Sequence, residues 1–416
     1  MRERKITHEH FLRGIDIMAS ACRPLWLGKN WTFRARQQCR CLCTKRNLTN
    51  SDVRQKRSAL FEEEKKRQFS LVTRIEKIEV QYKGTPEDTT LVMNKGLSTP
   101  FNCAMHIQEL LTSRTALALV DGEPWDMHRP LNKSCQLQFL HFQDEDPTIA
   151  NNAFWRTCSF TLGYVLENAF KDQYYIELCS FPKPNVKSGS FIYDADLKFD
   201  NWKPSKTELN CLSRIGAKLY HSDLQFERLD IDASLAAKIF EDNRFKSAQI
   251  PAIAAKSESG SKVTVYRMGD HVDITAGPLI SSTSLIGRFT VTAIHDIESP
   301  TLGPLKRVQG VALPTQLKMH YWTYDNILVS RGAKLNHAPF PFLSSRESKT
   351  KQKVRQRGKE RIPHMKADPR ESAAPTQSLR DPPGVRLGHA GVFNASGNAH
   401  CASAHAFAFR SAMKEF

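Results

Sequence analysis

The first clear pattern along the chain is an alternation of apolar and polar residues that begins near position 70. Ile78, Val80 and Tyr82 lie on one side of such a segment, as in a strand that buries one face. Similar patterns predict four further strands and one helix: strands at 90–93, 116–120, 123–125 and 135–139, and a helix at 101–111. This order predicts an α+β domain of β-grasp type over 70–146.

A second α+β domain is predicted over 147–332. It opens with an amphipathic helix in which Phe154, Leu162 and Leu166 share one face. The remaining elements are predicted in a mixed order: strands at 190–197 and 263–274, helices at 207–219 and 233–243, and a closing sheet within 288–324.

The ends of the chain have a different composition. No Asp or Glu occurs between Ala19 and Ser51, while Arg and Lys recur among aromatic residues, so 1–50 is predicted to be a mitochondrial targeting segment. A disordered basic tail is the alternative. Segment 51–69 is predicted to be a charged helix that lies on a partner's surface or forms a solvated linker.

The C-terminal segment 333–416 is predicted to be a disordered basic tail. Within it, 346–370 carries ten Lys or Arg residues against three Asp or Glu. This segment is either an RNA-binding tail or an atypical end of the chain, and the sequence does not separate the two.

Composition narrows the class of protein. The 416 residues leave room for two domains and tails, and the net charge of +17 favours a polyanionic partner, either nucleic acid or an anionic membrane surface. No apolar run reaches the roughly 18 residues that span a bilayer, so no transmembrane helix is predicted. Cys39, Cys41 and Cys43 match no common zinc spacing, so we expect no metal and reduced thiols inside the cell.

Several separated segments resemble threonyl-tRNA synthetases, in the order in which those enzymes carry them. The first group resembles the TGS domain: Ser98-Thr99-Pro100, then ALALVDGEP at 116–124 and LQFLHFQD at 137–144. The second group resembles the editing domain of threonyl- and alanyl-tRNA synthetases: WRTCSFTLGY at 155–164, SFIYDADL at 190–197 and HVDITAGPL at 271–279. The resemblance implies a β-grasp TGS domain followed by an editing-type α+β domain.

The resemblance also implies where the editing chemistry should lie. The family uses a His-x-x-x-His pair on the first helix and a Cys-x-x-x-His pair in the later loop. At the matching positions this chain has Arg156 and Phe160, then Thr275 and Leu279. None of the four supplies a metal ligand or a general base at neutral pH. The resemblance therefore implies that the editing residues are lost.

No other catalytic arrangement replaces them. Cys158 has no His at i+4, and His271 and His295 stand alone in the sequence. The 84 residues after Gly332 are too few for the catalytic and anticodon-binding domains of a synthetase, and no Walker A, Rossmann or HExxH motif occurs. We expect no catalytic residue, no cofactor and no metal site.

Together with the import-like leader, this pattern is similar to synthetase-related proteins of the mitochondrial large ribosomal subunit. It implies a non-enzymatic component in the mitochondrial matrix that contacts ribosomal RNA and other large-subunit proteins, with no membrane insertion and no small-molecule substrate. Basic positions near the two domains are candidates for RNA contact: Lys83, Arg114, Arg129, Lys133, Arg156 and Lys171. The alternatives are a free-standing tRNA-editing hydrolase and a TGS-type RNA-binding regulator.

Overall fold

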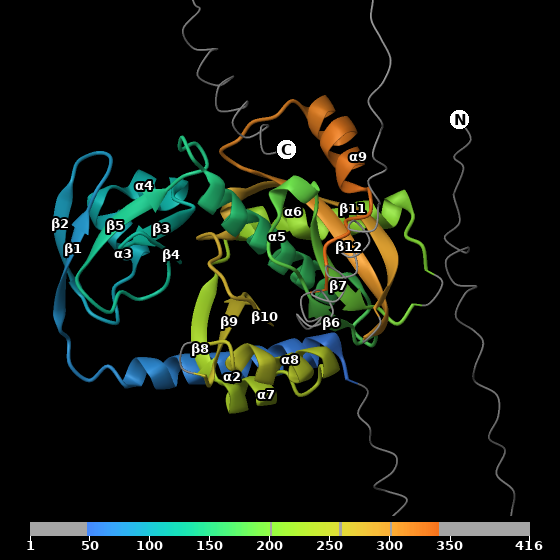
Figure 1. The fold of residues 1–416 in the computed structure, drawn as a ribbon, viewed down its shortest axis with the longest axis horizontal. Helices are drawn as coiled ribbons and strands as arrows, with labels where there is room; N and C mark the ends of the chain where they lie inside the picture. Colours follow the sequence, from blue (N-terminus) through green and yellow to red (C-terminus); the bar gives the residue numbers. More distant parts are fainter. Residues whose placement is uncertain (1–47, 200–201, 258–259, 300–301, 341–416) are drawn as a thin grey trace, which may run out of the picture. The chain divides into compact units, whose positions relative to one another are not determined.

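The computed structural model describes residues 48–199, 202–257, 260–299 and 302–340, and the fold is a mixed α+β arrangement (Figure 1). All these residues belong to one compact unit that begins at Leu48. Most of the predicted targeting segment 1–50, and all of the predicted tail beyond residue 340, lie outside the described residues.

The first sheet has five strands in the order β2-β1-β5-β3-β4. Neighbouring strands run antiparallel except β1 and β5, which are parallel. The bounds are β1 Lys77–Tyr82, β2 Thr89–Asn94, β3 Leu117–Val120, β4 Glu123–Trp125 and β5 Cys135–Leu140. All five strands overlap the predicted ones, because every second residue of β1 and of β5 points into the core.

Two short helices cover this sheet where one was predicted. They are α3, Pro100–Ile107, and α4, Glu109–Arg114. Thr99 begins α3 with a capping box in which its side chain and that of Asn102 bond each other's backbone N–H groups. The prediction of one continuous helix was wrong because Gln108 adopts an extended conformation, which ends the first helix after two turns.

The second part of the chain contains a four-stranded antiparallel sheet, β11-β12-β7-β6, and a three-stranded antiparallel sheet, β10-β9-β8. The strands of the larger sheet are β6 Glu177–Ser180, β7 Phe191–Asp196, β11 Ile286–Ser299 and β12 Gly303–Pro314. Those of the smaller sheet are β8 Glu227–Asp232, β9 Lys262–Met268 and β10 His271–Ile274. Strands β6 and β8 were not predicted from the sequence.

Within the described residues, four α-helices lie before or between the strands of these sheets in the sequence. They are α5 Thr148–Ala169, α6 Lys206–Ser222, α7 Ala233–Ile239 and α8 Arg244–Ala254. The long helix α5 supplies much of the largest core cluster, in which its apolar face meets residues of α6, β7, β11 and β12. Gly216 allows α6 to approach β11 closely, since a Cβ there would lie 2.4 Å from the Phe289 ring. None of the described helices has the length and apolarity to cross a lipid bilayer.

The charged N-terminal helix packs on the chain itself. This helix is α2, Asn50–Ser70, which starts at the side-chain cap Thr49. Val53 and Phe61 are buried, and Phe61 belongs to a cluster with residues of β8, β9, β10 and α7. The expectation that α2 lies on a partner or forms a solvated linker was therefore wrong, because its apolar side is covered by the smaller sheet.

The chain continues as ordered structure beyond the last strand. The closing sheet ends at Pro314, and residues that follow form a π-helix, η4 (Thr323–Leu328), joined to α9 (Val329–Gly332). Buried Asn336 donates its side-chain amide to the carbonyl of Ser190, and its backbone N–H to Gln309. The prediction of disorder from 333 was wrong for 333–340, because these residues satisfy buried polar groups of the sheet.

Direct bonds join the first sheet to the second part of the chain. The backbone N–H of Ser281 donates to the carbonyl of Ala116 at 3.1 Å, and its hydroxyl donates to the carbonyl of Thr115. Asp126, in the turn after β4, accepts from the Tyr266 hydroxyl and from the Leu279 N–H. The first sheet is thus anchored next to the loop that follows β10.

Candidate functional site

The first half of α5 and the loop after β10 meet at the place where the family resemblance puts its editing residues. Arg156 on α5 donates to the carbonyl of Pro278 at 3.0 Å. The Thr157 hydroxyl accepts from the N–H of Ile280, also at 3.0 Å. The structure therefore brings together the two segments that carry the four replaced positions.

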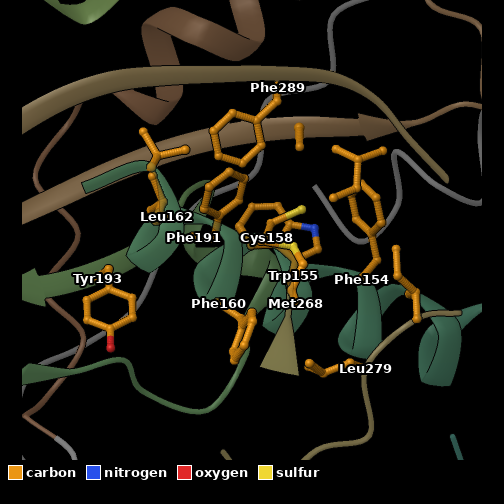
Figure 2. Close-up of a cluster of buried hydrophobic side chains, with 14 of the residues drawn as sticks. Phe154, Trp155, Cys158, Phe160, Leu162, Phe191, Tyr193, Met268, Leu279 and Phe289 are labelled. Carbon is orange, nitrogen blue, oxygen red and sulfur yellow. The ribbon is translucent and has the colours of Figure 1, made fainter. Parts of the chain in front are cut away.

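Apolar side chains occupy two of these positions. Phe160 and Leu279 are almost fully buried and belong to the main core cluster (Figure 2). The Phe160 ring meets the Phe226 ring edge-on at 6.0 Å, and it meets the imidazole of His271 at 4.9 Å. At these two positions, which the resemblance matches to editing residues, the structure has buried apolar side chains.

The two polar replacements also lack reactive chemistry. Burial lowers the pKa of Arg156 below its ordinary value, and the guanidinium is bonded to a main-chain carbonyl. Thr275 is buried in the same loop. Asp126 takes up the Leu279 N–H, so a carboxylate from the first sheet occupies a backbone donor of this loop.

The nearest thiol offers no nucleophile. Cys158 lies on α5 and is completely buried among apolar side chains (Figure 2). Burial raises its pKa well above the ordinary value of 9.0, so the reactive thiolate is not formed near neutral pH. His295 is bonded to the carbonyl of Ala333, far from this thiol in the sequence.

His271 is not alone, contrary to the sequence analysis. Its Nδ1 lies 2.6 Å from Glu167 near the end of α5, and Arg57 of α2 approaches the same carboxylate at 3.1 Å. Burial alone would raise the pKa of Glu167, but His271 and Arg57 outweigh it and hold the pKa below its ordinary value. Three separate elements are thus joined by one buried carboxylate.

A second set of buried ionisable side chains adjoins the Glu167 cluster. Lys246 of α8 lies 2.5 Å from Asp273 of β10, and the Tyr193 hydroxyl of β7 donates to the same carboxylate at 2.5 Å. Burial opposes ionisation of Asp273, but Lys246 and His271 outweigh it, so its pKa is also lowered. We call the six side chains the buried charge network: Arg57, Glu167, Tyr193, Lys246, His271 and Asp273.

The geometry assigns the buried charge network to structure rather than to reaction. None of its six residues is more than 4% exposed in side chain or residue. The free Nε2 of His271 faces α5, where a Cβ at Gly163 would lie only 3.0 Å away. Within the described residues no group of three or more His, Cys, Asp or Glu side chains could hold a metal ion.

Sequence reasoning missed this network because its members are scattered. Glu167 and His271 are 104 positions apart, and Arg57 is 110 positions from Glu167. The available signal was Glu167 itself, a carboxylate on a helix whose other nearby residues are apolar. Such a residue is rarely buried without a partner.

The six basic candidates for RNA contact lie in different surroundings. Lys83, Arg114 and Lys171 are exposed and have no ion pair among the described residues. Lys133 pairs with Asp121 at 2.8 Å, the Arg129 guanidinium lies 3.5 Å from the Trp125 ring, and Arg156 is turned inward. The structure does not gather the six on one face of a single element.

Comparison with known proteins gives two kinds of relative. The large ribosomal subunit protein mL39 of Drosophila melanogaster is 47% identical over 310 residues, which cover 74% of this chain and 87% of that protein. Threonine–tRNA ligase 2 of Bos taurus is 30% identical over 228 residues, and a probable ligase of Dictyostelium discoideum is 27% identical over 247 residues. The chain spans only 29% and 32% of these two ligases. No protein-family model matches the chain.

The fold and the similarity define a relative of threonine–tRNA ligases that corresponds to about a third of the length of those enzymes. The identity and coverage then decide the particular family. This chain belongs to the mL39 family of large ribosomal subunit proteins.

Proposed function

We propose that this protein is a non-enzymatic structural component of the large subunit of the mitochondrial ribosome, where it contacts ribosomal RNA and neighbouring ribosomal proteins. Membership of the mL39 family carries this proposal. The packed side chains of Phe160 and Leu279 support its negative part, since they leave no group to activate water. Fold alone would not decide the matter, because one fold serves many functions.

The proposed domain organisation follows the same reasoning. We assign 70–146 to a β-grasp TGS domain and 147–332 to a degenerate synthetase editing domain. The parallel pairing of β1 with β5, together with α3 and α4 between β2 and β3, supports the first assignment. The similarity to threonine–tRNA ligases supports the second. Segment 1–50 is proposed to direct import into mitochondria because of its basic, acid-free composition.

Three of the six basic residues are the stronger candidates for RNA contact. Lys83, Arg114 and Lys171 are exposed and unpaired within the described part of the chain, so they are free to neutralise phosphates. Lys133 would first have to leave Asp121, while Arg129 and Arg156 are partly buried. We therefore rank the first three above the others.

Sedimentation of mitochondrial extract tests the proposal. The protein is expected to move with large-subunit markers through a density gradient, and to shift with them when the subunits are separated at low magnesium. If it stays with soluble matrix proteins while those markers sediment, the proposed function is wrong.

A further inference from the structure

We propose that the helix formed by η4 and α9 presents a stacking platform for the unpaired bases of single-stranded RNA. This deepens the proposed function and rests on it, by naming a place where RNA is bound. The platform consists of the rings of His320, Tyr321 and Trp322 at the start of the helix. We call these three residues the aromatic platform.

The rings of the aromatic platform have no place in the core. Tyr321 is 65% exposed and Trp322 is 54% exposed. The His320 ring lies against Tyr321, with centroids 4.5 Å apart. The indole N–H of Trp125 donates to a carbonyl, whereas that of Trp322 finds no acceptor among the described residues. The His320 ring also accepts the backbone N–H of Trp322 at Nδ1. Exposed rings of this kind are suited to stacking on a partner.

The helix that carries the rings is clamped to the sheet. Tyr324 is buried beneath the Arg288 guanidinium, 4.2 Å from it, and its hydroxyl donates to the carbonyl of Val311. At the other end Gly332 packs so closely on Val311 that a Cβ would lie 2.4 Å from its methyl group. Because contacts at Tyr324 and Gly332 fix the helix on the sheet, the backbone that carries the rings is already ordered. Less entropy is then lost when a base stacks on them.

The backbone between the clamps is unusual. Thr323–Leu328 forms a six-residue π-helix, a geometry that is rare in proteins and concentrated at functional sites. Its wider turn follows directly after Trp322. The rare geometry thus begins at the residue after the platform and includes the buried Tyr324.

Basic residues lie on both sides of the platform along the chain. Lys318 precedes the rings, and Arg331 and Lys334 follow at the far end of the helix, beside the turn at Gly189. These cations are exposed and have no ion pair within the described residues. Asp325 is the sole carboxylate between residues 318 and 337, and Arg288 lies 3.7 Å from it.

These features favour single-stranded RNA over a protein or a duplex. Lysine is depleted at protein interfaces, whereas it is common where a phosphate backbone is bound. The bases of a duplex are already stacked on one another, so exposed rings gain little from it. The basic sequence at 346–370, which lies outside the described residues, continues the same charge.

Fluorescence anisotropy with the full chain tests the platform. The probe is a labelled single-stranded RNA of about 16 nucleotides, compared with the same strand in a duplex. Tyr321→Ala combined with Trp322→Ala is expected to weaken binding of the single strand about tenfold and to leave duplex binding unchanged. Tyr321→Phe with Trp322→Phe should retain binding, and Phe69→Ala removes an equally exposed ring elsewhere as a control.

The dependence of RNA affinity on salt separates the contribution of the lysines from that of the rings. Lys318→Ala with Lys334→Ala should reduce the slope of log Kd against log salt, whereas the alanine variant of the rings should keep it. Ultraviolet crosslinking of the wild-type chain should join RNA to the peptide that contains Tyr321 and Trp322. This measurement does not depend on the folding of any variant.

The outcomes are distinct. Equal binding by wild type and the ring variant, equal loss with single strand and duplex, or crosslinks confined to other peptides would each overturn the platform. If the wild-type chain binds neither RNA, both the platform and the proposed RNA contact fail. If it binds and only the platform fails, the proposed residence in the ribosome still stands on sedimentation.

Discussion

Two parts of α5 are both buried, one around Phe160 and one around Glu167, yet they carry different chemistry. The part around Arg156 and Phe160 is surrounded largely by apolar side chains, and Arg156 donates to the carbonyl of Pro278 in the loop after β10. The other part meets β10 through Glu167, which His271 and Arg57 share. Burial alone therefore does not say whether a part of this helix is held by apolar packing or by ion pairs. Buried charges join α5 to α2 and β10 around Glu167, whereas apolar side chains fill the surroundings of Phe160.

The largest expected effect breaks the buried charge network. Asp273→Asn leaves the Lys246 ammonium buried with no opposite charge at 2.5 Å. We expect a loss of about 4 kcal/mol in the free energy of unfolding, measured by urea denaturation. Asp270→Asn is the matched control, since the Asp270 side chain is 43% exposed and its pairing with Arg54 should contribute less than about 1 kcal/mol. Equal losses in the two variants would contradict the structural role.

The next largest effect is expected from Phe160 in the main core cluster. Phe160→Ala removes a fully buried ring from the contact with Phe226, and we expect a loss of about 3 kcal/mol from lost burial and the cavity left behind. Phe160→Leu should cost less, because it retains most of the volume. A loss below about 0.5 kcal/mol for alanine, the level of surface substitutions, would mean that this part of the core is not packed.

The third effect is a dependence of the free energy of unfolding on pH, which should come from the buried charge network and not from the surroundings of Phe160. Glu167 and Asp273 have folded pKa values below the ordinary 4.5 and 3.8, so their contribution is complete above those values and is lost as pH falls below them. The free energy of unfolding should therefore decrease on acidification below about pH 4. Glu167→Gln should flatten this decrease, whereas Phe160→Ala should keep the wild-type slope. Parallel curves for all three proteins would argue against the network.

The last prediction is that the protein does not hydrolyse mischarged tRNA. Purified protein incubated with serine-charged tRNA for threonine should release serine at the uncatalysed rate, because Phe160 and Leu279 leave no base or ligand. A threonyl-tRNA synthetase serves as the positive control. Release above background would favour the free-standing hydrolase and overturn the proposed function.

The sequence predicted those parts of the fold whose burial has a regular period. Strand β1 buries every second residue. The helical spacing of apolar residues located α5, although its middle, 157–163, is buried on every side. The burial of α2 could not be read in this way, because its buried residues include Asn50, Arg57 and Glu64. A helix that buries paired charges looks solvated in the sequence. Glu64 pairs with Arg67 on the same helix, but the partner of Arg57 is Glu167, 110 positions along the chain, and gives no local signal.

The same limit applies to the candidate site. The positions of Arg156, Phe160, Thr275 and Leu279 could be named from the family resemblance, and their lack of reactive groups follows from residue type. That Asp126 would bond the Leu279 N–H could not be predicted, since the two are 153 positions apart. Long-range polar contacts depend on the tertiary fold, and short motifs do not encode them.

The packing of α2 on the smaller sheet has a consequence for the order of assembly. Arg54 pairs with Asp270, which is synthesised 216 positions later, and Phe61 is covered by strands made after it. The entropy of closing so long a loop rises only slowly with length, but distant contacts slow folding. We therefore expect α2 to dock last although it is made early. The nascent chain must keep Phe61 from premature association until β10 exists.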